Sequence, residues 1–188
     1  MRSSRIKSLI VVCIAYLIAL SVGIYTLSFY DSSLLFRVLA ADILATVIIY
    51  IFSFIYRNSS IYDPYWSVIP PFILIYYIID NGHLNFQSIL LLFSILFWSI
   101  RLTFNWVRGW PGMHHEDWRY VDMRNYSGKY FEFSNFLGIH LFPTLIVFAC
   151  CLPMYSAVSK DLNVFTYIGF LVCFIGVLYE IISDQQLF

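Results

Sequence analysis

Residues Phe86–Tyr120 read FQSILLLFSILFWSIRLTFNWVRGWPGMHHEDWRY, an apolar run that ends in a dense polar segment. The apolar part, Phe86–Val107, has the length of about 20 residues that a helix needs to cross the hydrocarbon core of a membrane. The polar part begins at Trp98 and overlaps the end of that run. The stretch therefore predicts a membrane helix whose end serves a ligand or the membrane surface.

Composition places the whole chain in the membrane. Hydrophobic residues make up 61% of the 188 residues and charged residues only 12%, which excludes an ordinary water-soluble surface. The four cysteines lie within apolar stretches and lack the spacing of a zinc site or a redox pair. We expect a membrane lipid or another hydrophobic small molecule as the partner, and neither a nucleic acid nor a metal.

Six apolar stretches predict an all-α integral membrane protein. We expect a single domain over residues 1–188, folded as a bundle of about six transmembrane helices with a cytosolic interfacial loop or helix. The first stretch is too long for a secretory signal and reads as a retained anchor. The third is short and contains Pro70-Pro71, which predicts a kinked, tilted or partly re-entrant segment. The stretches are Ile6–Phe29, Leu34–Tyr56, Trp66–Ile79, Phe86–Val107, Phe136–Tyr155 and Leu162–Ser183.

The basic residues predict the orientation of this bundle. With the N-terminus in the cytosol and six crossings, nine lysines and arginines face the cytosol, and only Arg37 and Lys160 face the other side. An excess of cytosolic Lys and Arg is the usual bias in membrane proteins, and an odd number of crossings would damage it. We expect the protein in the endoplasmic reticulum or the plasma membrane, with its polar segments on the cytosolic face.

Arg101, Asn105 and Arg108 follow at spacings of four and three residues, hence on one face of a helix. Two guanidinium groups and an amide on one face suit the phosphate or carboxylate oxygens of a ligand. Arginines that reach lipid headgroups from a helix end explain the same pattern. Glu180 and Asp184 lie one turn apart on the last helix, and the two arginines are their expected partners.

A second polar group consists of Glu116, Asp117, Arg119 and Tyr120. Acidic side chains accept ribose hydroxyls or fix arginines, arginines bind phosphates, and aromatic rings stack on bases. The alternative is a salt-bridged amphipathic helix that lies at the membrane interface. The histidine pair at positions 114 and 115 has no third ligand at a suitable spacing, so it does not predict a metal site.

A third group, Tyr62-Asp63-Pro64-Tyr65, precedes the double proline. A tyrosine here, or an aspartate that keeps its proton, has the chemistry to donate that proton to a substrate carbonyl. We therefore select Asp63, Tyr62 and Tyr65 as candidate catalytic residues. The alternative is an aspartate helix cap beside interfacial aromatic residues.

Charged and aromatic positions recur in a fixed order along residues 63–188. They are Asp63-x-x-Trp66, Trp98-x-x-Arg101-Leu102, Arg108, Glu116-Asp117-x-Arg119-Tyr120, Met123-Arg124, and Glu180 with Ser183-Asp184-x-Gln186-Leu187. This order and spacing resembles the uncharacterised, DUF1295-type branch of the steroid 5-alpha-reductase-like membrane proteins. The first two apolar stretches contribute only hydrophobicity to the resemblance.

The resemblance implies an all-helical enzyme with NADPH in a cytosol-facing cavity. In characterised relatives hydride passes to an activated carbon–carbon double bond of a lipid such as an enone sterol, while an acidic or phenolic group polarises the carbonyl. The catalytic Glu and Tyr of those reductases have no matching motif here, so the three catalytic candidates rest on their own chemistry. The expected cofactor-binding residues are Arg101, Asn105, Arg108, Glu116, Asp117, Arg119, Tyr120 and Asp184.

Members of that family continue with a segment that holds an Arg-His-Pro-Asn-Tyr-type motif and a Gly-Glu, which resembles much of the cofactor clamp. This sequence ends at Phe188 without it, so we expect a fragment or a truncated product. The leading hypothesis is an NAD(P)H-dependent reductase of a lipid or steroid-like enone. The alternatives are a non-catalytic membrane scaffold or lipid-binding remnant, and a lipid methyltransferase, since the isoprenylcysteine carboxyl methyltransferases share a comparable helical core.

Overall fold

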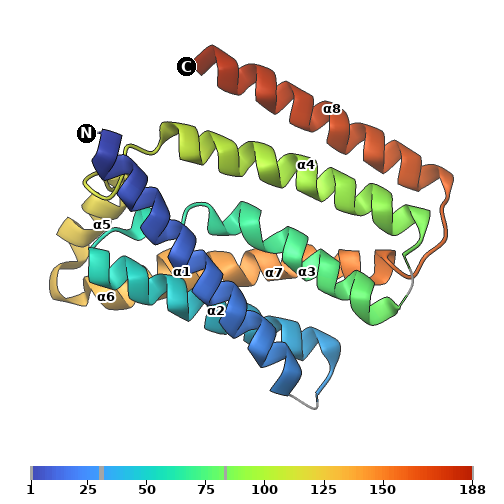
Figure 1. The fold of residues 1–188 in the computed structure, drawn as a ribbon, viewed down its shortest axis with the longest axis horizontal. Coiled ribbons are helices and arrows are strands. Elements are labelled where there is room, and N and C mark those ends of the chain that lie inside the picture. Colours follow the sequence, from blue (N-terminus) through green and yellow to red (C-terminus); the bar gives the residue numbers. More distant parts are fainter. Residues whose placement is uncertain (1, 30–31, 83, 188) are drawn as a thin grey trace. The chain divides into compact units, whose positions relative to one another are not determined.

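A computed structural model describes residues 2–29, 32–82 and 84–187 (Figure 1). All regular elements in these ranges are helical, which confirms the all-α membrane fold predicted from the sequence. Phe188, the last residue of the family-like region, lies outside the described residues. Five helical segments are long and apolar enough to cross a membrane: Ser4–Ser28, Leu34–Tyr56, Phe86–Gly109, Trp118–Ala157 and Val164–Gln186.

The third apolar stretch differs from the other predicted spans. It forms helix α3 (Tyr65–Asn81), whose 17 residues are fewer than the roughly 20 of a full crossing. Pro71 removes the backbone N–H that would bond the carbonyl of Ser67, and the hydroxyl of Ser99 donates a 2.6 Å hydrogen bond to that carbonyl instead. A neighbouring helix thus satisfies the group that the proline leaves unpaired. Six crossings therefore stay a prediction.

The chain divides into two compact units. Unit 1 comprises Met1–Trp66 and Gly109–Ala149, and unit 2 comprises Ser67–Arg108 and Cys150–Phe188. The boundary between residues 66 and 67 falls inside α3, and the boundary between residues 149 and 150 falls inside α7 (Phe142–Ala157). The single domain over residues 1–188 therefore also stays a prediction.

Unit 1 is built on the close pairing of α1 (Arg2–Phe29) with α2 (Leu34–Tyr56) (Figure 1). Ala15, Ala19 and Gly23 recur every four residues on α1, and the two alanines are buried. A Cβ added to Gly23 would lie 3.7 Å from the backbone oxygen of Ala41 and 4.0 Å from the Cβ of Ala45 on α2. Small residues at this spacing let membrane helices approach closely. This small-residue spacing is present in the sequence, although only hydrophobicity was expected to matter in the first two apolar stretches.

The rest of unit 1 is a chain of short helices that leads into α7. A turn of 3-10 helix, η1 (Ser59–Ile61), follows α2, and α5 (Trp118–Ser127) opens the second part of the unit. A 3-10 turn, η2 (Gly128–Tyr130), a short α6 (Phe131–Ser134) and a π-helical segment, η3 (Asn135–Leu141), then come before α7. The segments η1 and η3 both contact α2, so the polar turns gather around its end.

Unit 2 contains α4 (Phe86–Gly109) and α8 (Val164–Leu187), which run side by side in the same direction (Figure 1). Two ring pairs join them, Phe93 with Phe170 at 6.0 Å and Phe97 with Phe174 at 5.4 Å between centroids. Farther along, the same faces carry Arg101 on α4 and Asp184 on α8. The apolar pairing thus aligns the polar ends of the two helices.

Candidate functional site

Apart from Tyr62 and Tyr65, the predicted site residues fall into two clusters, one within each unit. In unit 1 the structure brings together a set that we call the Asp63 cluster: Asp63, Tyr120, Glu116, Asp117 and Arg119. In unit 2 it brings together the Arg101 cluster: Arg101, Asn105, Arg108, Glu180, Asp184 and Gln185.

The turn that carries Asp63 is fixed by Asn58, a residue that sequence analysis missed. The Asn58 side-chain oxygen accepts from the backbone N–H of Ser60 at 3.0 Å and so caps η1. Its amide nitrogen donates to the backbone carbonyls of Met113 (3.0 Å) and His115 (2.9 Å). Asn58-Ser59-Ser60 is a cap-forming sequence, so the signal was present, although its long-range partners were not readable.

Glu116 ties the same turn to α5. Its Oε1 accepts from the backbone N–H of Ser59 at 2.8 Å, and both of its oxygens accept from Arg124, at 3.1 and 3.2 Å. The hydroxyl of Ser60 also accepts from the backbone N–H of Asp117 at 2.9 Å. The carboxylate predicted to bind a cofactor is therefore engaged in joining η1 to α5.

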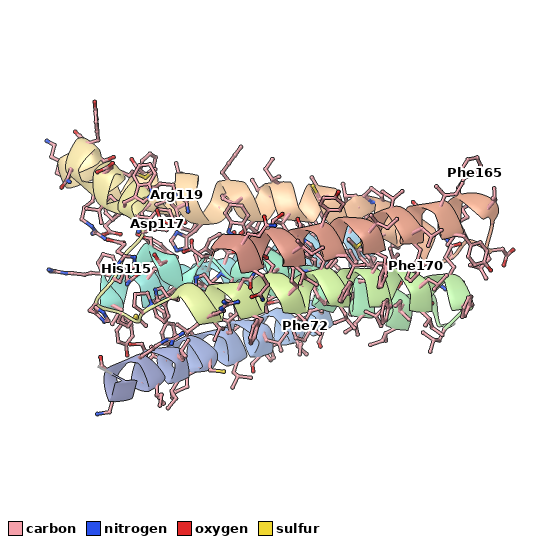
Figure 2. The ribbon with its side chains drawn as sticks, turned by 90° about the horizontal axis from the view of Figure 1, so that it is seen from above. Phe72, His115, Asp117, Arg119, Phe165 and Phe170 are labelled. Atoms are coloured by element: carbon pink, nitrogen blue, oxygen red, sulfur yellow. The ribbon has the colours of Figure 1, made fainter. Side chains whose placement is uncertain are left out.

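Asp117 is the N-cap of α5 and the partner of Arg119. Its Oδ1 accepts from the backbone N–H of Arg119 at 2.9 Å and from its Nε at 2.8 Å, while Oδ2 accepts from Nη2 at 3.0 Å. These bonds to Arg119 hold the pKa of Asp117 below its usual value. Figure 2 shows both side chains at the same end of unit 1, near His115. The Arg119 side chain is 58% exposed, so this ion pair faces outward.

Tyr120 and Asp63 form the central contact of the Asp63 cluster. The Tyr120 hydroxyl donates to Asp63 Oδ1 at 2.5 Å, and the tyrosine ring is buried whereas Asp63 is half-buried. The Arg119 guanidinium lies 5.7 Å from the centre of the Tyr120 ring. A carboxyl group, a phenol and an exposed cation thus lie together.

Tyr62 and Tyr65 lie apart from this surface. Both are fully buried, and their rings stack at 5.0 Å. The Tyr62 hydroxyl shares a 2.7 Å hydrogen bond with Thr144, and burial raises the pKa of Tyr62. The Tyr65 hydroxyl donates to Asp42 Oδ1 at 2.7 Å. Of the three catalytic candidates, only Asp63 is partly exposed.

The two tyrosines belong to a buried polar network around His140. Thr144 bonds Thr46 at 2.7 Å and donates to the His140 carbonyl at 2.9 Å. His140 Nδ1 lies 3.1 Å from the carbonyl of Asn135, which can only accept, so in the neutral ring Nε2 accepts from the Ser53 hydroxyl at 3.0 Å. Asp42 and His140, two ionisable residues within apolar helices, thus both have hydrogen-bond partners in the interior of unit 1.

The Arg101 cluster has the helix-face alignment that the spacing predicted. Arg101 binds Asp184 at 2.7 Å and Glu180 at 3.1 Å, as expected for the cation that compensates these carboxylates. Asn105 donates to the same Asp184 oxygen. Arg108 donates to the side-chain oxygen of Gln185 at 3.2 Å. A cavity of about 290 Å³ adjoins the cluster, and its apolar wall comprises Phe97, Ile100, Phe104 and Ile181.

Arg101 and Arg119, two of the three arginines predicted to bind the cofactor, differ in their fit to an anion. Arg101 is only 12% exposed and is neutralised by two carboxylates, so a phosphate would have to displace both. Arg119 holds one carboxylate at the surface, where an ion pair contributes about 1 kcal/mol or less, so a phosphate can replace that carboxylate. Among the described residues, no group of three or more His, Cys, Asp or Glu side chains could hold a metal ion.

The comparisons with known proteins identify a family but no characterised relative. A search of curated proteins and a search of solved structures each found no match. The model of one family, described as a protein of unknown function (DUF1295), matches residues 49–188. This range begins within α2 and includes both clusters. Since the match covers well over half of the chain, the protein belongs to the DUF1295 family.

Proposed function

We propose that this protein is a membrane-embedded, NAD(P)H-dependent reductase of an activated carbon–carbon double bond in a lipid or steroid-like enone. The observation that carries the proposal is the hydrogen bond from Tyr120 to Asp63 at the half-buried edge of unit 1. Membership in the DUF1295 family is compatible with the resemblance to the steroid 5-alpha-reductase-like proteins seen in the sequence.

The chemistry needs an acid next to the carbonyl oxygen of the enone. In its protonated form, Asp63 would donate from Oδ2 to that oxygen while Tyr120 donates to Oδ1. As the proton moves to the substrate, charge develops on the carboxylate, and the Tyr120 hydroxyl already points at it. Asp63 is therefore the proposed proton donor, and Tyr120 the group that holds and stabilises it.

Bound NADPH would supply the hydride that reaches the β-carbon of the enone. The π electrons would then move to the carbonyl oxygen, which takes the proton of Asp63. In the resulting enol, solvent would protonate the α-carbon as the O–H proton returns to Asp63. The net change adds one hydride and one proton across the double bond. Arg119 is the proposed ligand for a cofactor phosphate, since its side chain is exposed and its present partner is the single carboxylate of Asp117. We propose no phosphate contact for Arg101.

Tyr62 and Tyr65 receive a supporting role in this proposal. Their hydroxyls are fully buried and bonded to Thr144 and Asp42, so they hold the backbone on either side of Asp63. A second candidate function, lipid binding without catalysis, is favoured by one observation. The cavity beside the Arg101 cluster is mostly apolar with a polar end, which suits an amphipathic lipid-like molecule.

Cofactor binding separates these functions. Binding of NADPH, NADH and S-adenosylmethionine to the detergent-solubilised protein would be measured by titration calorimetry. We expect NADPH to bind and Arg119→Gln to weaken it about tenfold, the loss of one charge-assisted contact. Lys7→Gln removes an exposed charge from α1 and serves as the control. Binding of S-adenosylmethionine alone would favour the methyltransferase, and binding of none of the three would favour the non-catalytic lipid-binding protein.

A further inference from the structure

A groove of about 600 Å³ lies within unit 1, and it adjoins the Asp63 cluster through Arg124, which binds Glu116. It is formed by the end of α2 and by the segment from α5 to α6, and none of its lining residues was selected from the sequence as a site residue. The lining side chains that matter here are Phe54, Ile55, Arg57, Arg124, Lys129 and Glu132. We call it the basic groove.

Three cationic side chains and one carboxylate line the basic groove. Arg124 is engaged by Glu116 and lies 3.8 Å from Glu132, the carboxylate of the groove. Within the described part of the chain, the side chain of Arg57 has no hydrogen bond or ion pair. The Lys129 ammonium group has none either, and it lies over the Tyr130 ring. Two exposed cations thus remain available to an anion.

The backbone at Arg57 adds a second observation. This residue ends α2 in the left-handed conformation, with φ at 49°, where helices usually carry glycine. Its N–H bonds the carbonyls of Ser53 and Phe54, so the turn needs only the backbone. The arginine therefore contributes a side chain that the turn itself does not require.

The apolar wall of the groove points to a lipid. Phe54 and Ile55 are 54% and 64% exposed, and both belong to a helix long and apolar enough to span a membrane. Cations directly after such a span lie at the depth of the headgroups. A phosphate can contact Arg57 and Lys129 while its acyl chains follow Phe54 and Ile55 into the bilayer.

We propose that the basic groove binds the phosphate headgroup of an anionic phospholipid. Phosphate is the recognised chemistry, and the exposed apolar residues assign it to a lipid rather than to a free ion. The negative charge of the Glu132 carboxylate repels an anion, but the nearby Arg124 offsets this charge. The same carboxylate also accepts hydrogen bonds from Asn135 at 3.2 Å and Tyr50 at 3.4 Å.

The test compares the thermal unfolding midpoint of the detergent-solubilised chain with dioleoyl phosphatidylglycerol, with dioleoyl phosphatidylcholine and with inorganic phosphate. We expect phosphatidylglycerol alone to raise the midpoint. Arg57→Gln and Lys129→Gln should each raise the half-effective lipid concentration about tenfold, as expected for one lost charge-assisted contact. Lys7→Gln, an equal change of charge outside the groove, should leave it unchanged.

Arg57→Gly is a second variant that shows whether Arg57→Gln acts through misfolding. It also lacks the guanidinium group, but glycine readily adopts the left-handed conformation of this turn. Its response to phosphatidylglycerol should match that of Arg57→Gln. Equal stabilisation by the two lipids, or an unchanged response in both Arg57 variants, would overturn the proposal. Stabilisation by inorganic phosphate that competes with the lipid would assign the groove to a soluble anion instead.

Discussion

The hydroxyl of Tyr120 bonds the carboxyl group of Asp63, which joins the start of α5 to the turn before α3 within unit 1. The two residues are 57 positions apart and come from segments that the sequence assigned to different tasks, one to the cofactor and one to catalysis. Their contact places an acid and a hydrogen-bond donor at one half-buried point. The proposed reductase chemistry depends on this contact.

Removing the Tyr120 hydroxyl tests the contact itself. Tyr120→Phe keeps the buried ring but deletes the bond to Asp63, so we expect the free energy of unfolding to fall by about 1–2 kcal/mol. Unfolding in mixed SDS micelles measures the change. Tyr126→Phe, on the same helix and 96% exposed, is the matched control and should leave stability unchanged. Equal effects of the two variants would refute the structural role of the bond.

The small-residue contact of α1 and α2 predicts opposite effects of two substitutions. Gly23→Ala adds a methyl at ordinary contact distances and improves helix propensity, so stability should rise by up to about 1 kcal/mol. Ala19→Leu places a large side chain at a buried position and should destabilise by about 1–3 kcal/mol. Thermal unfolding in detergent measures both. Destabilisation by Gly23→Ala would contradict the observed space around Gly23.

The ion pairs of Arg101 predict a non-additive mutant cycle. Arg101→Met leaves Glu180 and Asp184 without their cation and should destabilise unit 2 by about 1–3 kcal/mol. Adding Asp184→Asn removes one of the two repelling carboxylates, so the double variant should be more stable than Arg101→Met alone. The coupling is measured from the unfolding free energies of wild type, Arg101→Met, Asp184→Asn and the double variant under one condition. Strictly additive effects would show that the contact contributes nothing.

Asp117 predicts part of the acid sensitivity of the protein. Its pKa in the folded state lies below its ordinary value, so its stabilising effect is present above the unfolded pKa of about 3.9 and is lost as the pH falls through the folded pKa. Asp117→Asn keeps a helix cap but has no such titration. Wild type should therefore lose more stability than this variant between about pH 5 and pH 2. Parallel thermal unfolding curves measure the difference, and Asp122→Asn, also on α5, should behave like wild type.

The fold was more predictable than the site, for physical reasons. Apolar length and low charge determine membrane helices locally, so five of the six stretches correspond to candidate spans, and only α3 is short. The position of Arg101 and Asn105 on one helix face also follows from helix geometry, and the opposite charges of Arg101 and Asp184 predicted their pairing. The links of Asn58 to the 113–115 loop and of Tyr65 to Asp42 join segments distant in sequence. No local pattern encodes such partners, and they determine which candidate side chains are buried.

The most direct test of the proposed activity measures the transfer of a labelled hydride from NADPH to the lipid. The solubilised protein would receive NADPH deuterated at the transferred position together with an enone sterol, and the lipid product would be analysed by mass spectrometry. We predict a saturated product that carries one deuterium, with a rate at least about 100-fold lower in Asp63→Asn and unchanged in Lys7→Gln. A labelled product formed at the wild-type rate by Asp63→Asn, or no labelled product from wild type across sterol, polyprenyl and fatty enones, would contradict the account.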